Sequence, residues 1–261
     1  MELLTLLALA LAPGAAIATY IYWRDEHEKE PLRLMRKSFL FGLISILITS
    51  VLSLVVYPMI GLGLEDSPLE TLRYHPMRML LFAVVGVGFV EELSKWIMVR
   101  SKIYSWVNFN EPYDGIFYSV MVSLGFATLE NIGYVFGAEA ISPEAGLLTG
   151  FLRMFTAVPA HAVNGILMGY FIGKAKFEDK NKDLNMALSI LTPTLLHGAY
   201  DYFAFLDWIP GIIAGAIVAL IIGVVLSLKA IKIHQDNSPF KNMKPATTID
   251  DSEQTTSSEL S

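Results

Sequence analysis

The sequence contains no cysteine and little charge. Of its 261 residues, only 17% are Asp, Glu, Lys or Arg, while 54% are hydrophobic. The absence of cysteine excludes a disulfide scaffold, a thiol nucleophile and thiolate ligands for zinc or iron–sulfur clusters. A soluble domain carries about 25% charged residues, so this composition excludes a soluble globular protein. There is also no basic stripe, and we therefore expect no nucleic-acid partner.

Long apolar runs dominate the sequence instead. A membrane helix needs about 20 mostly apolar residues. Seven windows meet this requirement: 3–22, 39–64, 79–99, 115–138, 145–173, 184–206 and 209–228. They predict an all-α, polytopic membrane helix bundle with about seven transmembrane helices in a lipid bilayer. The integral membrane domain would cover 1–233, and a disordered, acidic, Ser/Thr-rich cytoplasmic tail would cover 234–261.

The positions of Lys and Arg predict the orientation, because cytoplasmic loops collect basic residues. Fifteen of the 19 basic residues lie in every second connection and in the C-terminal region: 23–38, 100–114, 174–183 and 229–261. The alternate connections hold only Arg73 and Arg78. The bundle is therefore predicted to be N-outside and C-inside. The first window could also be a cleaved signal peptide, but its flank is acidic rather than basic, so we expect an uncleaved span.

Ionisable residues interrupt the third to sixth windows. A charge at the centre of a membrane helix costs about 2.5–3.5 kcal/mol on the insertion scale. These windows nevertheless contain Glu91, Glu92, Lys95, Glu130, Arg153, His161, His197 and Asp201. In the predicted topology the glutamates and histidines fall near the bilayer midplane. They are expected to face one shared polar site inside the bundle.

Helical spacing suggests how two groups of these residues pair. Glu91 and Glu92 precede Lys95 by four and three residues, so Lys95 can lie beside either carboxylate. The two carboxylates project about 100° apart, so one can contact Lys95 while the other faces water. Asp201 follows His197 by four residues and can orient the imidazole.

The fourth and fifth windows add a further group. Glu130 has no cation within its own helix, and its partner is expected to be Lys95, Arg153 or an imidazole. Pro159 lies between Arg153 and His161 and is expected to kink the fifth helix. Each pair alone is also typical of helix packing, but the shared depth favours a functional site.

Four motifs follow one another in the chain. They are EExxK at 91–95, FxxxEN at 126–131, RxxxxxPxH at 153–161 and HxxxD at 197–201. Together they resemble the PrsW family of glutamic-type intramembrane proteases, which is distantly similar to CAAX-processing and bacteriocin-protection proteases. The resemblance covers about residues 15–230. It implies cleavage of a membrane-anchored protein in the bacterial cytoplasmic (inner) membrane, as in the first cut of an anti-sigma factor by some members.

The leading hypothesis is hydrolysis of a peptide bond by a glutamate-activated water. Glu91 or Glu92 would be the general base, and His197, supported by Asp201, would move a proton or stabilise the oxyanion. The expected catalytic set is Glu91, Glu92, Glu130, His161, His197 and Asp201, and the expected supporting set is Lys95, Asn131, Arg153 and Asn164.

Three alternatives use the same residues. We expect no metal and no cofactor, but a zinc-dependent protease could bind the ion through Glu92, His161 and His197. A proton-coupled transporter would also place Glu, His and Asp at the midplane. A non-catalytic membrane scaffold that binds a partner helix would tolerate Glu92→Gln.

Overall fold

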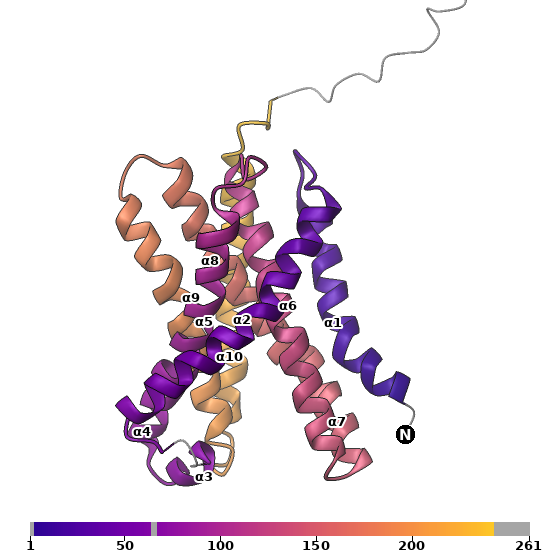
Figure 1. Ribbon diagram of the computed structural model, residues 1–261, viewed down its shortest axis with the longest axis vertical. Coiled ribbons are helices and arrows are strands. Elements are labelled where there is room, and N and C mark those ends of the chain that lie inside the picture. Colours follow the sequence, from indigo (N-terminus) through magenta and orange to yellow (C-terminus); the bar gives the residue numbers. More distant parts are fainter. Residues whose placement is uncertain (1–2, 64–66, 243–261) are drawn as a thin grey trace, which may run out of the picture.

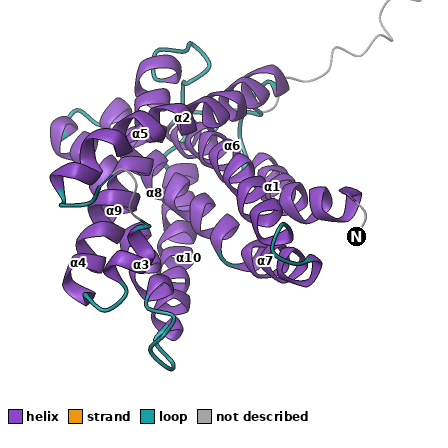
Figure 2. Cartoon of the chain, turned by 60° about the horizontal axis from the view of Figure 1, so that its bottom comes forward, coloured by secondary structure: helices purple, strands orange, loops and turns teal. Residues whose placement is uncertain are grey.

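The apolar windows fold as helices, as expected. The computed structural model describes residues 3–63 and 67–242, which contain helices and no strand (Figures 1 and 2). The elements are α1 (Leu3–Arg24), α2 (Leu32–Met59), α3 (Pro68–Leu72), α4 (Pro76–Leu81), the π-helix η1 (Phe82–Phe89), α5 (Val90–Met98), the π-helix η2 (Val99–Ile103), α6 (Pro112–Glu139), α7 (Pro143–Phe155), α8 (Ala157–Phe177), α9 (Lys182–Phe205) and α10 (Ile213–Asp236). The all-α prediction is confirmed for the described part of the chain. The predicted tail from 234 lies mostly outside it.

Five helical segments among the described residues are long and apolar enough to cross a membrane: Leu3–Arg24, Leu32–Met59, Pro112–Glu139, Pro143–Phe177 and Ile213–Asp236. The other two predicted windows, 79–99 and 184–206, also fold as helices. The total of seven spans remains a prediction. In Figure 1 the connections after α1, η2 and α8 lie at the same end as the end of α10, which is the arrangement that the basic residues predict.

Glycines allow the central helix α6 to pack closely against α8 and α2. A Cβ added to Gly115 would lie 2.5 Å from the carbonyl oxygen of Gly169 on α8. A Cβ on Gly125 would lie 2.0 Å from the carbonyl oxygen of Phe39 on α2. Small residues of this kind let membrane helices approach backbone to backbone. As a result α6 is almost continuously buried from Pro112 to Thr128.

Glycines also bring α9 against the π-helix that precedes α5. A Cβ on Gly88 would lie 2.9 Å from the carbonyl oxygen of Thr194, and one on Gly198 would lie 2.6 Å from Cα of Val84. This contact places His197 beside the start of α5. Gly198 therefore permits the close approach of α9 to this π-helix.

The fifth predicted span is interrupted rather than smoothly kinked. Thr156 has φ −122° and ψ −79°, and it separates α7 from α8. Pro159 is the third residue of α8. In the first turn of a helix, proline costs little because its missing N–H would have no intrahelical partner. The interruption therefore lies three residues before the proline.

Candidate active site

Glu92 and Lys95 form the buried centre of the cluster. Both side chains have no exposed surface, and Lys95 Nζ donates to Glu92 Oε1 at 2.8 Å. Lys95 Nζ also lies 3.4 Å from Glu91 Oε2. The ammonium thus contacts both carboxylates, as the spacing predicts, but its contact with Glu92 is the shorter one.

Helix α9 contributes His197 and Asp201. His197 Nδ1 lies 2.9 Å from Glu92 Oε1, and its Nε2 lies 3.3 Å from Asp201 Oδ2 and 3.9 Å from Glu91 Oε2. Carboxylates accept hydrogen bonds and do not donate them when ionised. The imidazole can therefore hold or release a proton on the side of Glu91 while Glu92 fixes the other nitrogen.

Glu130 of α6 is paired by residues of α7 and α8. Arg153 Nη2 donates to Glu130 Oε2 at 2.5 Å, and His161 Nε2 lies 3.0 Å from the same oxygen. The expectation of a partner from another helix is confirmed. On its other side, His161 Nδ1 lies 3.2 Å from Lys95 Nζ. Since an ammonium only donates, Nδ1 accepts from Lys95 and the Nε2–H donates to Glu130.

The two predicted asparagines differ in their contacts. Asn131 Oδ1 accepts from Arg153 Nε at 2.7 Å, and its amide donates to the carbonyl oxygen of Ala10 at 3.1 Å. It therefore fixes α6 against α7 and α1. The amide of Asn164 is buried, has no hydrogen-bond partner among the described residues and lies beside His197 at a small cavity.

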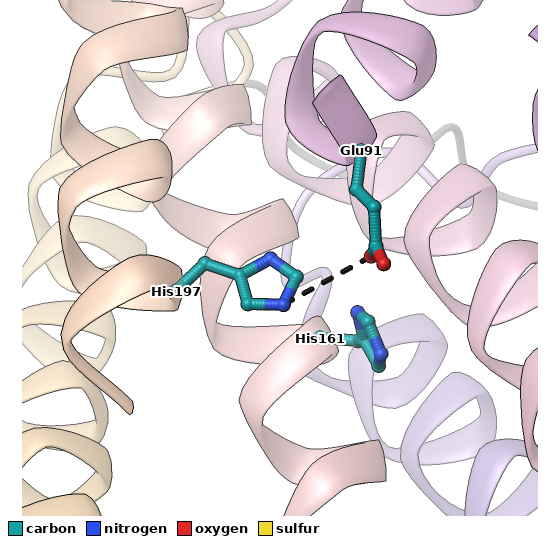
Figure 3. Close-up of side chains that lie close together, drawn as sticks. All are labelled: Glu91, His161 and His197. Carbon is teal, nitrogen blue, oxygen red and sulfur yellow. Dashed lines mark ion pairs between the residues drawn. The ribbon is translucent and has the colours of Figure 1, made fainter. Parts of the chain in front are cut away.

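Glu91, His161 and His197 converge from three helices (Figure 3). One ligand-type atom from each lies within 4.8 Å of the other two. The zinc set predicted from the sequence contained Glu92 with the same two histidines, whereas the group that converges here contains Glu91. Adjacent residues project about 100° apart on a helix, and Glu92 points instead at Lys95 and His197 Nδ1.

These three residues fit a metal ion by residue type. Two His and one Glu are the protein ligands of a common kind of catalytic zinc site. In each ring one nitrogen is already paired with a carboxylate, Glu92 for His197 and Glu130 for His161. Such outer carboxylates are the usual partners of metal-binding histidines. Lys95 also points at this site, however, and places a positive charge within 3.4 Å of two of the three ligands.

A cavity of about 410 Å³ opens onto this cluster. Its lining includes Glu91, Glu130, His161, His197 and Asp201, but not Glu92 or Lys95. Of the two adjacent glutamates, Glu91 therefore faces the space that a substrate could enter. Glu92 lies behind it.

Several residues of the site were not predicted from the sequence. Thr49, Tyr134 and Tyr200 line the cavity, and Arg153 stacks on Tyr134 with its guanidinium carbon 4.0 Å from the ring centre. Tyr134 follows Glu130 by four residues, and this spacing could have identified it. Thr49 and Tyr200 are uncharged and lie in apolar or mixed segments, so no similar signal marks them.

The motifs, the geometry and the comparisons with known proteins agree. A family model described as "PrsW family intramembrane metalloprotease" matches residues 30–228. The chain belongs to this family. It is thereby an intramembrane protease, and the transporter and scaffold alternatives are not supported. No solved structure gives a significant match.

Curated relatives named "Protease PrsW" extend over most of the chain. The relative from Geobacillus kaustophilus (strain HTA426) is 36% identical over 198 residues, which is 76% of this chain and 79% of the relative. The relative from Bacillus subtilis (strain 168) is 34% identical, covering 78% and 85%. The relative from Clostridioides difficile (strain 630) is 33% identical, covering 87% and 88%. The resemblance inferred from the four motifs is confirmed.

Proposed function

We propose that this PrsW-family protein hydrolyses a peptide bond of a membrane-anchored protein, using a water molecule activated by Glu91. The reaction would take place in the bacterial cytoplasmic membrane. Membrane-anchored regulators of the anti-sigma factor kind are the first substrates to test. The observation that carries the proposal is that Glu91 faces both the cavity and the two imidazoles, whereas Glu92 is enclosed.

In this mechanism Glu91 takes a proton from water as the water oxygen attacks the carbonyl carbon. His197, oriented by Asp201, stabilises the oxyanion that forms. Glu91 then gives the proton to the leaving nitrogen as the C–N bond breaks, which leaves a carboxylic acid and an amine.

The remaining polar residues act by positioning. Glu92 holds Nδ1 of His197 and, with Lys95, keeps α5 in register with α9. Arg153 and Glu130 orient His161 from the other side. Their contribution is to hold the reacting groups in place, which can account for a large share of a catalytic rate.

The family description includes a metal, and the same three residues would hold it. Glu91, His161 and His197 are the candidate ligands, and a bound metal would supply a Lewis acid and a more acidic water. We favour the metal-free form because the Lys95 ammonium already occupies the neighbourhood of Glu91 and His161. Treatment with chelators separates the two chemistries.

The test is cleavage in proteoliposomes. The wild type, Glu91→Gln and His197→Ala would each be offered a library of single-span reporter proteins, and the products would be identified by mass spectrometry. Glu178→Gln is the matched control, because this carboxylate is exposed on the loop after α8. Cleavage by the wild type and the control, with none by the other two variants, supports the proposal. The same products from all four proteins would overturn it.

A further inference from the structure

A second hollow lies beside the candidate active site, along the half of α6 that follows Glu130. It has a volume of about 650 Å³. It is lined by Ile46 and Thr49 of α2, by Glu91 of α5, by residues between Phe126 and Ile141 on α6 and just after it, and by Thr149 of α7. In both views of the bundle, α1 and α7 lie on the same side of α6, away from α3, α4 and α9 (Figures 1 and 2). We call this hollow the α6 groove.

The α6 groove is continuous with the candidate active site. Thr49, Glu91, Glu130 and Tyr134 line both the groove and the 410 Å³ cavity. A chain segment lying in the groove would therefore reach Glu91 without crossing a layer of packed side chains.

Two glycines form an unpartnered surface within the groove. Gly133 and Gly137 are four residues apart on α6 and are exposed. A Cβ added to either would meet no atom within 4 Å. This contrasts with Gly125 on the same helix, where an added Cβ would lie 2.0 Å from a backbone oxygen of α2. Pairs of small residues at this spacing are a common packing surface for a second membrane helix.

The groove also has a suitable length. From Glu130 to Ile141 the chain advances by eleven residues, or about 16 Å at 1.5 Å per residue. The hydrocarbon core of a bilayer is about 30 Å thick, so the groove extends from the predicted midplane to the predicted outer surface. It would accommodate the outer half of a transmembrane helix.

We propose that the α6 groove docks the transmembrane helix of the substrate, with Gly133 and Gly137 as the contact surface and with the scissile bond delivered to Glu91. This inference rests on the proposed function and adds the substrate class and its route of entry. A second copy of this chain is the competing occupant. The continuity of the groove with Glu91 favours the substrate, because a dimer contact has no need to reach a catalytic carboxylate.

Crosslinking tests the docking directly. The chain contains no cysteine, so the Gly137→Cys variant carries a single thiol. The probe is a Lys-flanked Leu/Ala transmembrane peptide of about 20 residues with one cysteine in its outer half, co-reconstituted with the full chain and mildly oxidised. Ile213→Cys at the outer start of α10, where Ile213 is 51% exposed, is the matched control at a similar predicted depth.

Three crosslinking results are informative. We expect about tenfold more peptide adduct at Gly137→Cys than at Ile213→Cys, equivalent to about 1.4 kcal/mol of preference. Equal adduct at both positions would overturn the proposal. Disulfide-linked dimers of Gly137→Cys that persist in excess peptide would also overturn it and would assign the groove to a second copy.

Kinetics supply an independent measurement. A Cβ at Gly133 or Gly137 meets no atom within 4 Å, so Gly133→Leu with Gly137→Leu would place apolar bulk in the groove. Ala214→Leu on α10 is an exposed control. The double variant should raise KM for a single-span reporter while the control does not, and an unchanged KM would count against docking.

The crosslinking does not depend on catalysis, so the two proposals can fail separately. Repeating it in a Glu91→Gln background measures docking without turnover. Adduct formation by a wild type that cleaves nothing would contradict only the proposed function. Cleavage by a wild type that forms no preferential adduct would contradict only the docking.

Discussion

His197 Nδ1 donates to the carboxylate of Glu92 at 2.9 Å, across 105 positions of sequence. This hydrogen bond fixes the ring so that Nε2 faces Asp201 and Glu91. Glu92 also accepts from Lys95 at 2.8 Å. One buried carboxylate therefore sets the position of both the imidazole and the ammonium, while its neighbour Glu91 remains turned toward the cavity.

This division between the two glutamates predicts different losses. Glu91→Gln should lower kcat by about 10²- to 10⁴-fold, the usual contribution of a general base, with little change in Tm. Glu92→Gln should lower both kcat and Tm, because breaking a buried ion pair costs about 3–5 kcal/mol. Turnover of a reporter and thermal unfolding in detergent measure the two quantities. A Glu91→Gln variant as active as wild type would exclude Glu91 as the base.

Replacing Arg153 even by lysine is expected to lower the activity. Its Nε donates to Asn131 and its Nη2 donates to Glu130, and a single ammonium cannot reproduce both directions. We expect Arg153→Lys to reduce kcat by about tenfold, as misplaced catalytic groups do, with a smaller change in KM. The control is Arg24→Lys, since Arg24 pairs with Glu26 at the exposed end of α1. Equal kcat values for the two variants would show that Arg153 acts as a charge only.

The sequence predicted which residues would meet, but not how they would be oriented. Midplane depth and the i,i+4 spacing were sufficient to group Glu91, Lys95, His197 and Asp201. They did not reveal which glutamate faces the cavity, because this depends on the rotation of α5 relative to α8 and α9. The predicted zinc set contained Glu92 for this reason, whereas the Glu/His/His group that converges in the structure contains Glu91.

The irregularities of the helix backbone could not be predicted from the hydrophobic pattern of the sequence either. Pro159 predicted a kink in the fifth helix, but the helix is instead interrupted at Thr156, since proline is tolerated in the first turn of the helix that follows. The π-helices on either side of α5 leave no clear periodic signal in a uniformly apolar segment. Uncharged lining residues such as Thr49 escape notice because they cost little inside a membrane helix.

The connection between α1 and α2 should make stability depend on pH. Burial, followed by repulsion from Glu111, raises the pKa of Asp25 from 3.8 to about 7. Burial likewise raises the pKa of Glu30 from 4.5 to about 7. The folded state then binds more protons than the unfolded state between about pH 4 and 7, so stability should fall as the pH rises through this window.

Asp25→Asn isolates this contribution. The variant should lose part of the decrease in Tm between pH 5 and pH 8, whereas Glu26→Gln, a change at a half-exposed carboxylate, should retain it. Thermal unfolding at a series of pH values gives the comparison. A Tm profile of Asp25→Asn that superimposes on wild type would show that Asp25 titrates normally.

Chelation should leave the activity intact if Glu91 activates water without a metal. We expect unchanged turnover after dialysis against a strong chelator and less than one zinc per chain by elemental analysis. Loss of activity that zinc restores would instead place Glu91, His161 and His197 as ligands, in keeping with the residue types that zinc prefers.

The glycines of α6 provide a prediction about folding that separates internal packing from open surface. Gly125→Ala would place a Cβ 2.0 Å from the carbonyl oxygen of Phe39, so α2 and α6 would have to move apart and the Tm should fall. Gly133→Ala meets no neighbour and should stabilise the helix by up to about 1 kcal/mol, the difference in helix propensity between the two residues. Both variants add the same methyl group to the same helix, so opposite shifts in Tm can arise only from what lies next to each position. Shifts of the same sign would show that α2 does not pack against Gly125 as closely as the structure indicates.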